Sequence, residues 1–455
     1  MRLNARKSVP LLALCSLSML ALGTETVQAA PMKTITWLVP EDPLLDRYAA
    51  SVVSAFEKIH PGVNVKVITP GSTAYSQKFM ALVAAGQTPD VFTHWNSIGV
   101  YTLVSHHLVA YLNPYFRAAK TSPSFIPAMY RKEFTQNGEL FAIPWNSNPN
   151  FLVYNKTLFR KYRVPFLTTS WNDRHWTLNT LLQDARRLTH NTNNPAKATW
   201  GAVLNSGSLG SLAWLWGADT FNDRGGPKDS PAYHGGPIHT YATRPPVVAA
   251  MQWLADLTTK WHVSPPTGDL TALSTLGNPF FSGRVGIVEV AAGWLNRQAA
   301  VAKPKFQWAI APMPYGPAGV DTVQREDGAL YLSRTSAHPH TAFQFMLFAV
   351  RGFGAEQFIR LAENNPVHVG SKYYNQWVNQ VMRIPNLSMT RSQFSGVFQG
   401  GIAHSFPDPA NLLNNASYFS NTFTQLMAPV WLGKESAAKG LQAVSRAWQS
   451  GGGTG

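Results

Sequence analysis

The chain has 455 residues, of which 45% are hydrophobic and only 13% are charged, about half of the roughly 25% that globular proteins carry. This length exceeds what one hydrophobic core usually holds, so two domains are expected. Lys and Arg number 38 against 23 Asp and Glu, a net charge of +15, yet the basic residues are scattered, which disfavours a nucleic-acid-binding protein.

The small number of acidic residues also bears on the surroundings in which the protein works. A carboxylate that is paired in the folded state destabilises the fold once it is protonated. A chain with only 23 Asp and Glu has few such groups to lose. The composition therefore favours the hypothesis of a protein that works in acidic surroundings over that of an anionic partner such as a membrane surface.

The first 29 residues have the features of a secretory signal peptide. Three basic residues precede an apolar run at 9–22, which is too short to span a bilayer comfortably, and VQA at 27–29 predicts cleavage after Ala29. The only cysteine, Cys15, lies inside the apolar run and follows Leu14, which does not fit a lipid-anchor signal. We therefore expect an exported protein, periplasmic or extracellular and associated with the cell surface, with no lipid anchor and no disulfide.

The first part of the mature chain alternates strands and helices. Strands are predicted at 35–39, 63–67 and 90–93, with helices at 45–59 and 76–85 between them. Apolar residues of the first helix recur at steps of three and four, which places them on one helix face. The alternation predicts an α/β layer with a largely parallel sheet.

The second part begins with PWNSNP at 144–149, which should separate two strands. The predicted strands are 140–143, 151–154, 285–288 and 306–311, and the predicted helices are 178–188 and 247–260. The C-terminal part should be mainly helical, with helices at 341–349, 355–361, 416–427 and 436–448.

No catalytic or metal-binding motif stands out in the sequence. GxSxG, HExxH and the P-loop are absent, and these are the patterns that would predict hydrolase, zinc or nucleotide chemistry. A glycosidase needs two carboxylates that face one bond, and nothing indicates that the pairs Glu41-Asp42 and Glu326-Asp327 meet. We therefore expect a protein that is not an enzyme and that needs no cofactor or metal.

Six short motifs follow one another along nearly the whole mature chain. They are FEKIHPGVNV at 56–65, AGQTPDV at 85–91, GELFAIP at 138–144, YNK at 154–156, WTL at 176–178, and FSGRVGI at 281–287 with GW at 293–294. In this order they resemble the extracellular solute-binding proteins (family 1) of bacterial ABC importers, the sugar-binding group that includes maltodextrin-binding protein. Gly286-Ile287, where the family usually has Ala-Met, is a departure, as is the missing lipobox cysteine.

The resemblance implies an α/β fold of two lobes, the type II periplasmic-binding-protein fold, whose lobes are joined by a hinge of three chain crossings. The ligand is expected in the cleft between the lobes, which close around it. The crossings are expected near Pro144, 312–314 and 365–366. Lobe one then comprises 31–143 and 314–365, and lobe two comprises 144–313 and 366–455.

Trp294 leaves two alternatives open. It follows the apolar run 285–288 and Gly293, where a strand passes into a loop. A tryptophan here is either a core residue, since aromatic side chains are usually buried, or a platform for the apolar face of a sugar. The resemblance favours the platform, because Trp294 falls on the family's cleft tryptophan.

The resemblance implies further ligand contacts. Five of them follow strands of lobe one: Glu41, Asp42, Tyr75, Trp95 and Asn96. Asn148 lies just past the first hinge crossing, Trp214 and Trp216 precede GAD at 217–219, and Glu326 and Asp327 stand near the return into lobe one. For Glu41 and Asp42 the alternative is a charge at a helix N-terminus. One of the two tryptophans at 214 and 216 is alternatively a core residue.

The family implies a monomeric binding protein that captures a carbohydrate, with an oligosaccharide favoured, and delivers it to the membrane permease subunits of an ABC importer. Two alternatives remain. The positive net charge favours an anionic ligand such as a glycerol phosphate, and an aromatic cleft also suits a secreted carbohydrate-active enzyme. The 15 tryptophans favour a sugar ligand.

Overall fold

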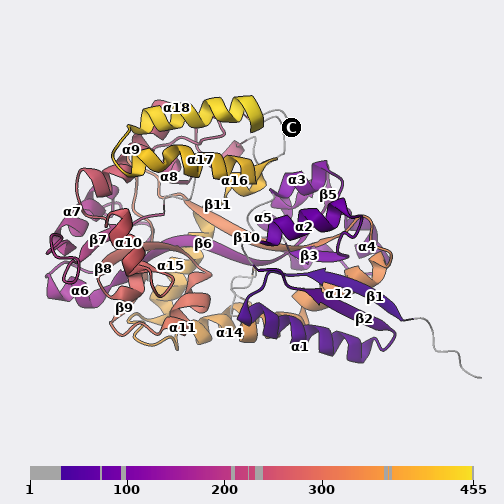
Figure 1. The fold of residues 1–455 in the computed structure, drawn as a ribbon. Helices are drawn as coiled ribbons and strands as arrows, with labels where there is room; N and C mark the ends of the chain where they lie inside the picture. Colours follow the sequence, from indigo (N-terminus) through magenta and orange to yellow (C-terminus); the bar gives the residue numbers. More distant parts are fainter. Residues whose placement is uncertain are drawn as a thin grey trace, which may run out of the picture.

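The computed structural model describes residues 32–71, 74–93, 99–205, 211–223, 225–230, 239–362, 367 and 371–452. The predicted signal peptide lies outside this part of the chain. Two lobes with separate hydrophobic cores share a mixed sheet that runs through the middle of the molecule (Figure 1).

The first lobe has parallel strands connected by helices, as predicted. β1 (Lys33–Leu38) pairs with β2 (Val63–Ile68) and β3 (Val91–Thr93), and α1 (Pro43–Ile59) and α2 (Tyr75–Ala84) make the connections. The other elements of this lobe are α3 (Val100–Ser105), α4 (Asn113–Ala118), η2 (Pro123–Phe125), α5 (Ala128–Glu133), β4 (Thr135–Gln136), β5 (Glu139–Leu140), α12 (Pro339–Val350), α13 (Gly352–Gln357) and η7 (Phe358–Ala362).

Helix α1 shows how the local sequence determines an element. Asp42 caps its N-terminus, and the Oδ1 of Asp42 accepts hydrogen bonds from the backbone N–H of Leu44 at 2.9 Å and Leu45 at 3.2 Å. Such a cap satisfies donors that the first helical turn leaves open. The predicted apolar face carries Tyr48 and Phe56, which are fully buried in the first core.

The second lobe is built around the long strand β6 (Ile143–Asn155). β8 (Val285–Ala291) and β9 (Trp308–Ala311) pair with β6, and β7 (Trp200–Val203) pairs with β8. Its other elements before β10 are α6 (Lys156–Lys161), α7 (Leu178–Leu188), α8 (Ser211–Trp214), η3 (Pro227–Asp229), α9 (Pro245–Thr259), α10 (Thr267–Leu273), η5 (Pro279–Ser282), η6 (Leu295–Ala299) and α11 (Ala300–Ala302).

The segment 144–149, expected to separate two strands, is instead part of one strand. β10 (Val323–Leu332) runs antiparallel to β6, in a register from Arg325 opposite Pro149 to Leu330 opposite Ile143. The prolines at 144 and 149 reduced the local strand signal because proline cannot donate to a ladder. The long-range pairing with β10 overrides that signal.

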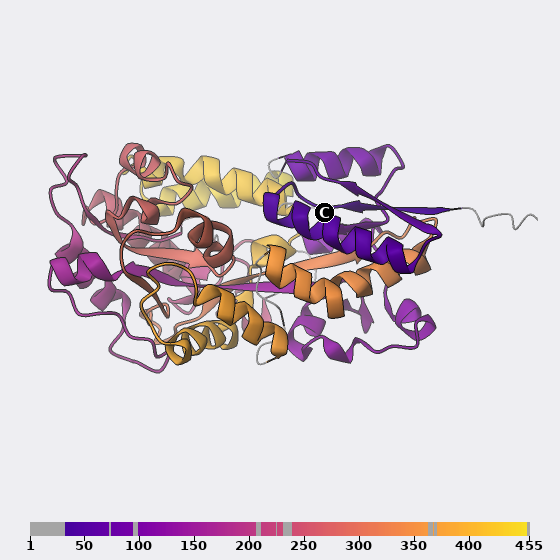
Figure 2. The same cartoon turned by 90° about the horizontal axis from the view of Figure 1, so that it is seen from below.

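Strands β6 and β10 carry the sheet from one lobe to the other. β10 also pairs with β3, so the order is β2-β1-β3-β10-β6-β8-β7. Figure 2 shows the two strands passing between the lobes. Met313, in the segment where a crossing was expected, lies in the core of the second lobe, and the passage along β10 comes later in the chain. The expected crossing at 365–366 lies outside the described residues, and the lobe boundaries stay a prediction.

The C-terminal part is mainly helical, as predicted, and touches both lobes. Its elements are α14 (Lys372–Val381), α15 (Arg391–Ala403), β11 (Ser405–Pro407), α16 (Pro409–Leu412), α17 (Ala416–Trp431), α18 (Ala437–Ala447) and η8 (Trp448–Gly452). β11 pairs with β10. Leu412 lies in the first core and Leu413 in the second. None of the helices described here is both long and apolar enough to cross a membrane.

Candidate ligand-binding site

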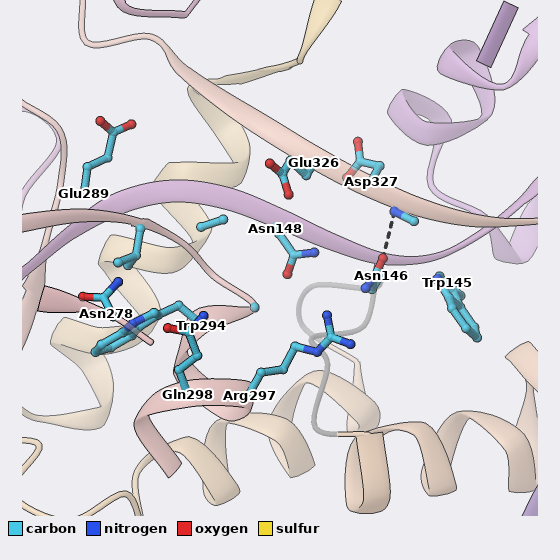
Figure 3. Close-up of a pocket in the computed structure, with 14 residues that line it drawn as sticks. Trp145, Asn146, Asn148, Asn278, Glu289, Trp294, Arg297, Gln298, Glu326 and Asp327 are labelled. Carbon is cyan, nitrogen blue, oxygen red and sulfur yellow. Dashed lines mark hydrogen bonds between the residues drawn. The ribbon is translucent and has the colours of Figure 1, made fainter. Parts of the chain in front are cut away.

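A cavity of about 290 Å³ lies where β6 and β10 pass between the lobes (Figure 3). Such a volume is at the lower end of the range for small-molecule sites, about 300–1,000 Å³. The lining comes from β6, β10, the end of β8, the segment between β8 and η6, η6 itself and the residue before η5. The residues are Trp145, Asn146, Asn148, Asn278, Glu289, Val290, Ala291, Gly293, Trp294, Arg297, Gln298, Glu326, Asp327 and Gly328.

The pairing of β6 with β10 brings together four polar side chains of the cavity, those of Asn146, Asn148, Glu326 and Asp327. Asn148 lies opposite Glu326 in the ladder, and Asn146 lies opposite Gly328. The Gly328 N–H donates a hydrogen bond to Asn146 Oδ1 at 2.8 Å. A Cβ at position 328 would lie 2.6 Å from Trp145 Nε1, so only glycine permits this close approach at the register shift that follows it.

Trp294 forms part of the cavity wall and also belongs to an aromatic cluster. Its side chain is only 5% exposed. It stacks on Phe281 at 5.1 Å between ring centroids and makes edge contacts with Phe280 at 5.6 Å and Trp308 at 5.8 Å. The core interpretation therefore describes its packing, and the role as a platform for a sugar stays a prediction that its place in the cavity wall supports.

Glu289 is a partly buried carboxylate on β8, which lies across β6 from β10 in the sheet. The Asn150 side-chain amide donates to its Oε1 at 2.8 Å, and the Asn205 N–H donates to its Oε2 at 3.0 Å. Burial raises the pKa of Glu289, and these two hydrogen bonds partly oppose that rise. The two donors fix the orientation of the carboxylate at the end of β8.

Asp327 belongs to a buried charge cluster beneath the cavity. Arg325 donates from Nε to Asp327 and from Nη2 to Glu133 at 2.9 Å, and the exposed fractions of these three side chains are 6% or less. Burial, reinforced by the charge of Asp327, raises the pKa of Glu133, and Arg325 opposes the rise. One guanidinium thus joins α5 of the first lobe to the crossing strand β10.

Arg297 connects the cavity to the first lobe. Its guanidinium points into the space below Asn148 (Figure 3). Arg297 Nη2 forms an ion pair with Asp42 Oδ2 at 2.9 Å, and the two side chains are 19% and 24% exposed. Burial lowers the pKa of Arg297, and the Asp42 carboxylate raises it.

Four of the predicted contacts line this cavity: Trp294, Asn148, Glu326 and Asp327. Asp42 reaches it through Arg297. Its neighbour Glu41 is exposed and forms a backbone bridge with Gly71.

Three predicted aromatic contacts lie away from this cavity. Tyr75 is buried in the first core and donates its hydroxyl to the carbonyl of Thr93. Trp214 is buried in the second lobe, and its Nε1 donates to Asp219 Oδ2 at 2.6 Å. Trp216 is partly buried against that lobe. Trp95 and Asn96 lie outside the described residues.

Sequence reasoning missed several lining residues. Trp145 and Asn146 stand in PWNSNP, beside the predicted Asn148, and Arg297 follows Trp294 by three positions. The clearest signal was Glu289, the single charge within the apolar strand VGIVEVA. A charged residue in such a strand needs a partner or a function. No group of acidic, histidine or cysteine side chains in the described ranges could hold a metal ion.

Solved structures of low sequence identity share this fold. An ABC substrate-binding protein from Listeria monocytogenes in complex with cycloalternan is 18% identical, with a TM-score of 0.75, and the match covers 92% of this chain and 99% of that one. An ABC transporter solute-binding protein from Thermotoga lettingae bound with α-D-tagatose is 17% identical, with a TM-score of 0.66 over 91% of this chain and 98% of that one. A maltose/maltodextrin-binding domain from Bdellovibrio bacteriovorus bound to maltotriose is 13% identical, with a TM-score of 0.67 over 92% and 99% of the two chains.

These similarities confirm the predicted two-lobe α/β fold of type II periplasmic binding proteins. A family model described as bacterial extracellular solute-binding protein matches residues 42–351. The matched region contains α1, both crossing strands and every residue that lines the cavity. The chain therefore belongs to the bacterial extracellular solute-binding protein family.

Proposed function

We propose that the protein captures a carbohydrate in the cavity between its lobes and delivers it to the permease subunits of an ABC importer. The observation that carries the proposal is the cavity lining. Trp145 and Trp294 lie on opposite sides of it, with the amide of Asn148 between them (Figure 3). Aromatic faces suit the C–H surface of a sugar ring, and amides and carboxylates suit its hydroxyls.

The charges around the cavity favour a neutral sugar over an anionic ligand. Among the described lining residues, Glu289, Glu326 and Asp327 are acidic and Arg297 is the basic one. Arg297 is already paired with Asp42. Asp327 is likewise paired, with Arg325. The carboxylates of Glu289 and Glu326 would repel an anionic ligand in a partly desolvated site, so the positive net charge of the chain does not favour such a ligand here.

The size of the cavity favours a short ligand. About 290 Å³ suits a small saccharide better than a long polymer. The complexes with cycloalternan, tagatose and maltotriose concern other proteins, and they support carbohydrate as the class of ligand without selecting a sugar.

A thermal-shift screen with mono- and oligosaccharides tests the proposal. A sugar present at 100 times its Kd should stabilise the protein by roughly 2.7 kcal/mol. Glycerol 3-phosphate forms the anionic arm of the screen, and release of reducing sugar from polysaccharides forms the enzymatic arm. A shift with the phosphate alone, or release of reducing sugar, would contradict the proposal.

Variants locate the binding in the cavity. Asn148→Ala removes an amide from the lining and should weaken sugar binding about tenfold, because a lost hydrogen bond to a buried polar ligand is typically worth 1–2 kcal/mol. Asn172→Ala, at an exposed position outside the lining, is the matched control and should bind normally. Equal affinities of both variants would place the sugar elsewhere.

Delivery and export need their own measurements. Deleting the gene should abolish uptake of the sugar that binds, and uptake that continues unchanged would refute delivery. We further propose that residues 1–29 direct export. The secreted protein should then have the intact mass of a chain that begins at Ala30, and it should elute as a monomer in gel filtration.

A further inference from the structure

One ion pair joins the two lobes beside the cavity. Asp42 belongs to the start of α1, whose buried face packs in the first core, whereas Arg297 belongs to η6, whose Leu295 and Ala299 are buried in the second lobe. The two residues are 255 positions apart in the chain, and Arg297 Nη2 lies 2.9 Å from Asp42 Oδ2. Opening the cleft at this point must separate them.

The first lobe holds the Asp42 carboxylate in a fixed orientation. Its Oδ1 accepts hydrogen bonds from the N–H groups of Leu44 and Leu45, while its other oxygen faces Arg297. The N-terminus of a helix also stabilises negative charge. The carboxylate therefore needs little ordering to receive a guanidinium from the other lobe.

The second lobe presents Arg297 at the cavity. Its side chain lines the cavity and is 19% exposed, so solvent screens the ion pair less than it screens a surface pair. An arginine in such surroundings keeps its charge. Without Asp42, the positive charge of Arg297 would be less well compensated when the lobes are closed.

We propose that Asp42 is a positioning residue that holds Arg297 across the cleft, so that the pair both orients the guanidinium toward the ligand and stabilises the closed lobes before the ligand arrives. This gives Asp42 a different role from the direct ligand contact predicted from the sequence. The first part, the orientation of Arg297 toward the ligand, rests on the proposed function. Stabilisation of the closed state is a property of the free protein. Since apparent affinity scales with the population of the binding-competent state, the pair should strengthen binding.

The test measures the distance between the lobes in the ligand-free protein. Spin labels at Lys58→Cys on α1 and Val301→Cys on α11, both exposed, report this distance by pulsed electron resonance. Asp42→Asn keeps an oxygen that can cap α1 but removes the charge. It should shift the distribution to longer distances, and Arg297→Gln should produce the same shift from the other side.

The double variant and the dependence on salt concentration distinguish the loss of the ion pair from other effects of the substitutions. The double variant should show no larger shift than either single variant, because the pair is already broken. Raising NaCl from 0.05 to 1 M should lengthen the distance in the parent protein and leave the variants unchanged. Glu435→Gln breaks an ion pair with Lys439 inside the second lobe and should leave the distance unaltered. Unchanged distances in both single variants, with normal melting curves, would overturn the proposal.

Affinity provides the second readout. With the sugar that gives the largest shift in the screen, Asp42→Asn should bind about three- to tenfold more weakly. If no sugar binds, the proposed function fails while the distance measurements still decide the closed-state role. If sugars bind with equal affinity to the parent and to both variants, the role of Asp42 in binding is refuted while the proposed function stands.

Discussion

Replacement of Trp294 by alanine should damage the fold and the binding site together. The side chain is 5% exposed and contacts three aromatic rings at 5.1, 5.6 and 5.8 Å between centroids. Truncating a buried tryptophan typically costs 3–5 kcal/mol of stability. Because the two lobes should unfold together, the relevant unit has about 420 residues, and each kcal/mol then changes the melting temperature by about 1 °C. The melting temperature of the free protein should therefore fall by roughly 3–6 °C.

The same truncation removes part of the cavity wall. Aromatic anchors at the centre of an interface cost 2 kcal/mol or more when truncated, so affinity for the sugar found in the screen should fall about 30-fold or more. A titration at a temperature where the variant is folded measures this loss. Trp294→Phe, which keeps an aromatic face, should recover part of both quantities.

Trp377 offers a matched control. It is fully buried among aromatic rings in the same core and does not line the cavity. Trp377→Ala should lower the melting temperature by a similar amount and leave affinity unchanged. Two results would refute the reasoning about Trp294: a melting temperature within about 2 °C of the parent would contradict its structural role, and an affinity equal to that of the Trp377 variant would contradict its role in the wall.

Three further predictions concern charge and close contact. Burial raises the pKa of Asp184 to about 6, above its unfolded value near 4, so the stability contributed by the protonated carboxyl group is lost as pH rises from about 4 to 6. Asp184→Asn should therefore raise the melting temperature at pH 7 and match the parent at pH 3. A variant less stable than the parent at pH 7 would contradict this. Arg325→Met leaves two buried carboxylates without their cation and should lower the free energy of unfolding by about 3–5 kcal/mol, measured by urea denaturation; a loss below about 1 kcal/mol would show that the cluster is dispensable. Gly328→Ala places a Cβ 2.6 Å from Trp145 Nε1 and should weaken sugar binding at least tenfold in a titration. The control is Gly396→Ala, whose Cβ would meet nothing beyond its own helix within 4 Å, and it should leave binding unchanged.

The parts of the fold that depend on local pattern were predictable. The apolar face of α1 and the alternation in β2 are patterns of neighbouring residues, and so are the signals that end both elements. The structure places these elements within a few residues of the prediction. The continuous strand β6 was not predictable in this way, because Pro144 and Pro149 weaken its local signal. Only the pairing with β10, more than 170 residues later, reveals the strand.

The binding site was predictable only in part for a related reason. The family resemblance identified Asn148 and Glu326, which line the cavity from within the crossing strands β6 and β10. A position along the chain does not show which way a side chain turns. Tyr75 and Trp214 were predicted as contacts in the same way, yet each turns inward because its polar group finds a buried acceptor, the carbonyl of Thr93 or the carboxylate of Asp219.

The strands that pass between the lobes have a consequence for how the molecule unfolds. β10 pairs with β3 in the first lobe and with β6, whose other end pairs with β8 in the second. Neither lobe can therefore lose its share of this ladder without exposing a strand edge in the other. A proteolytic cut between β9 and β10 would separate each lobe from strands encoded on the other fragment, so the two fragments should remain associated and refold only when mixed. Under the proposed mechanism of ligand capture the two lobes open and close as separate bodies, yet they should melt as one cooperative unit.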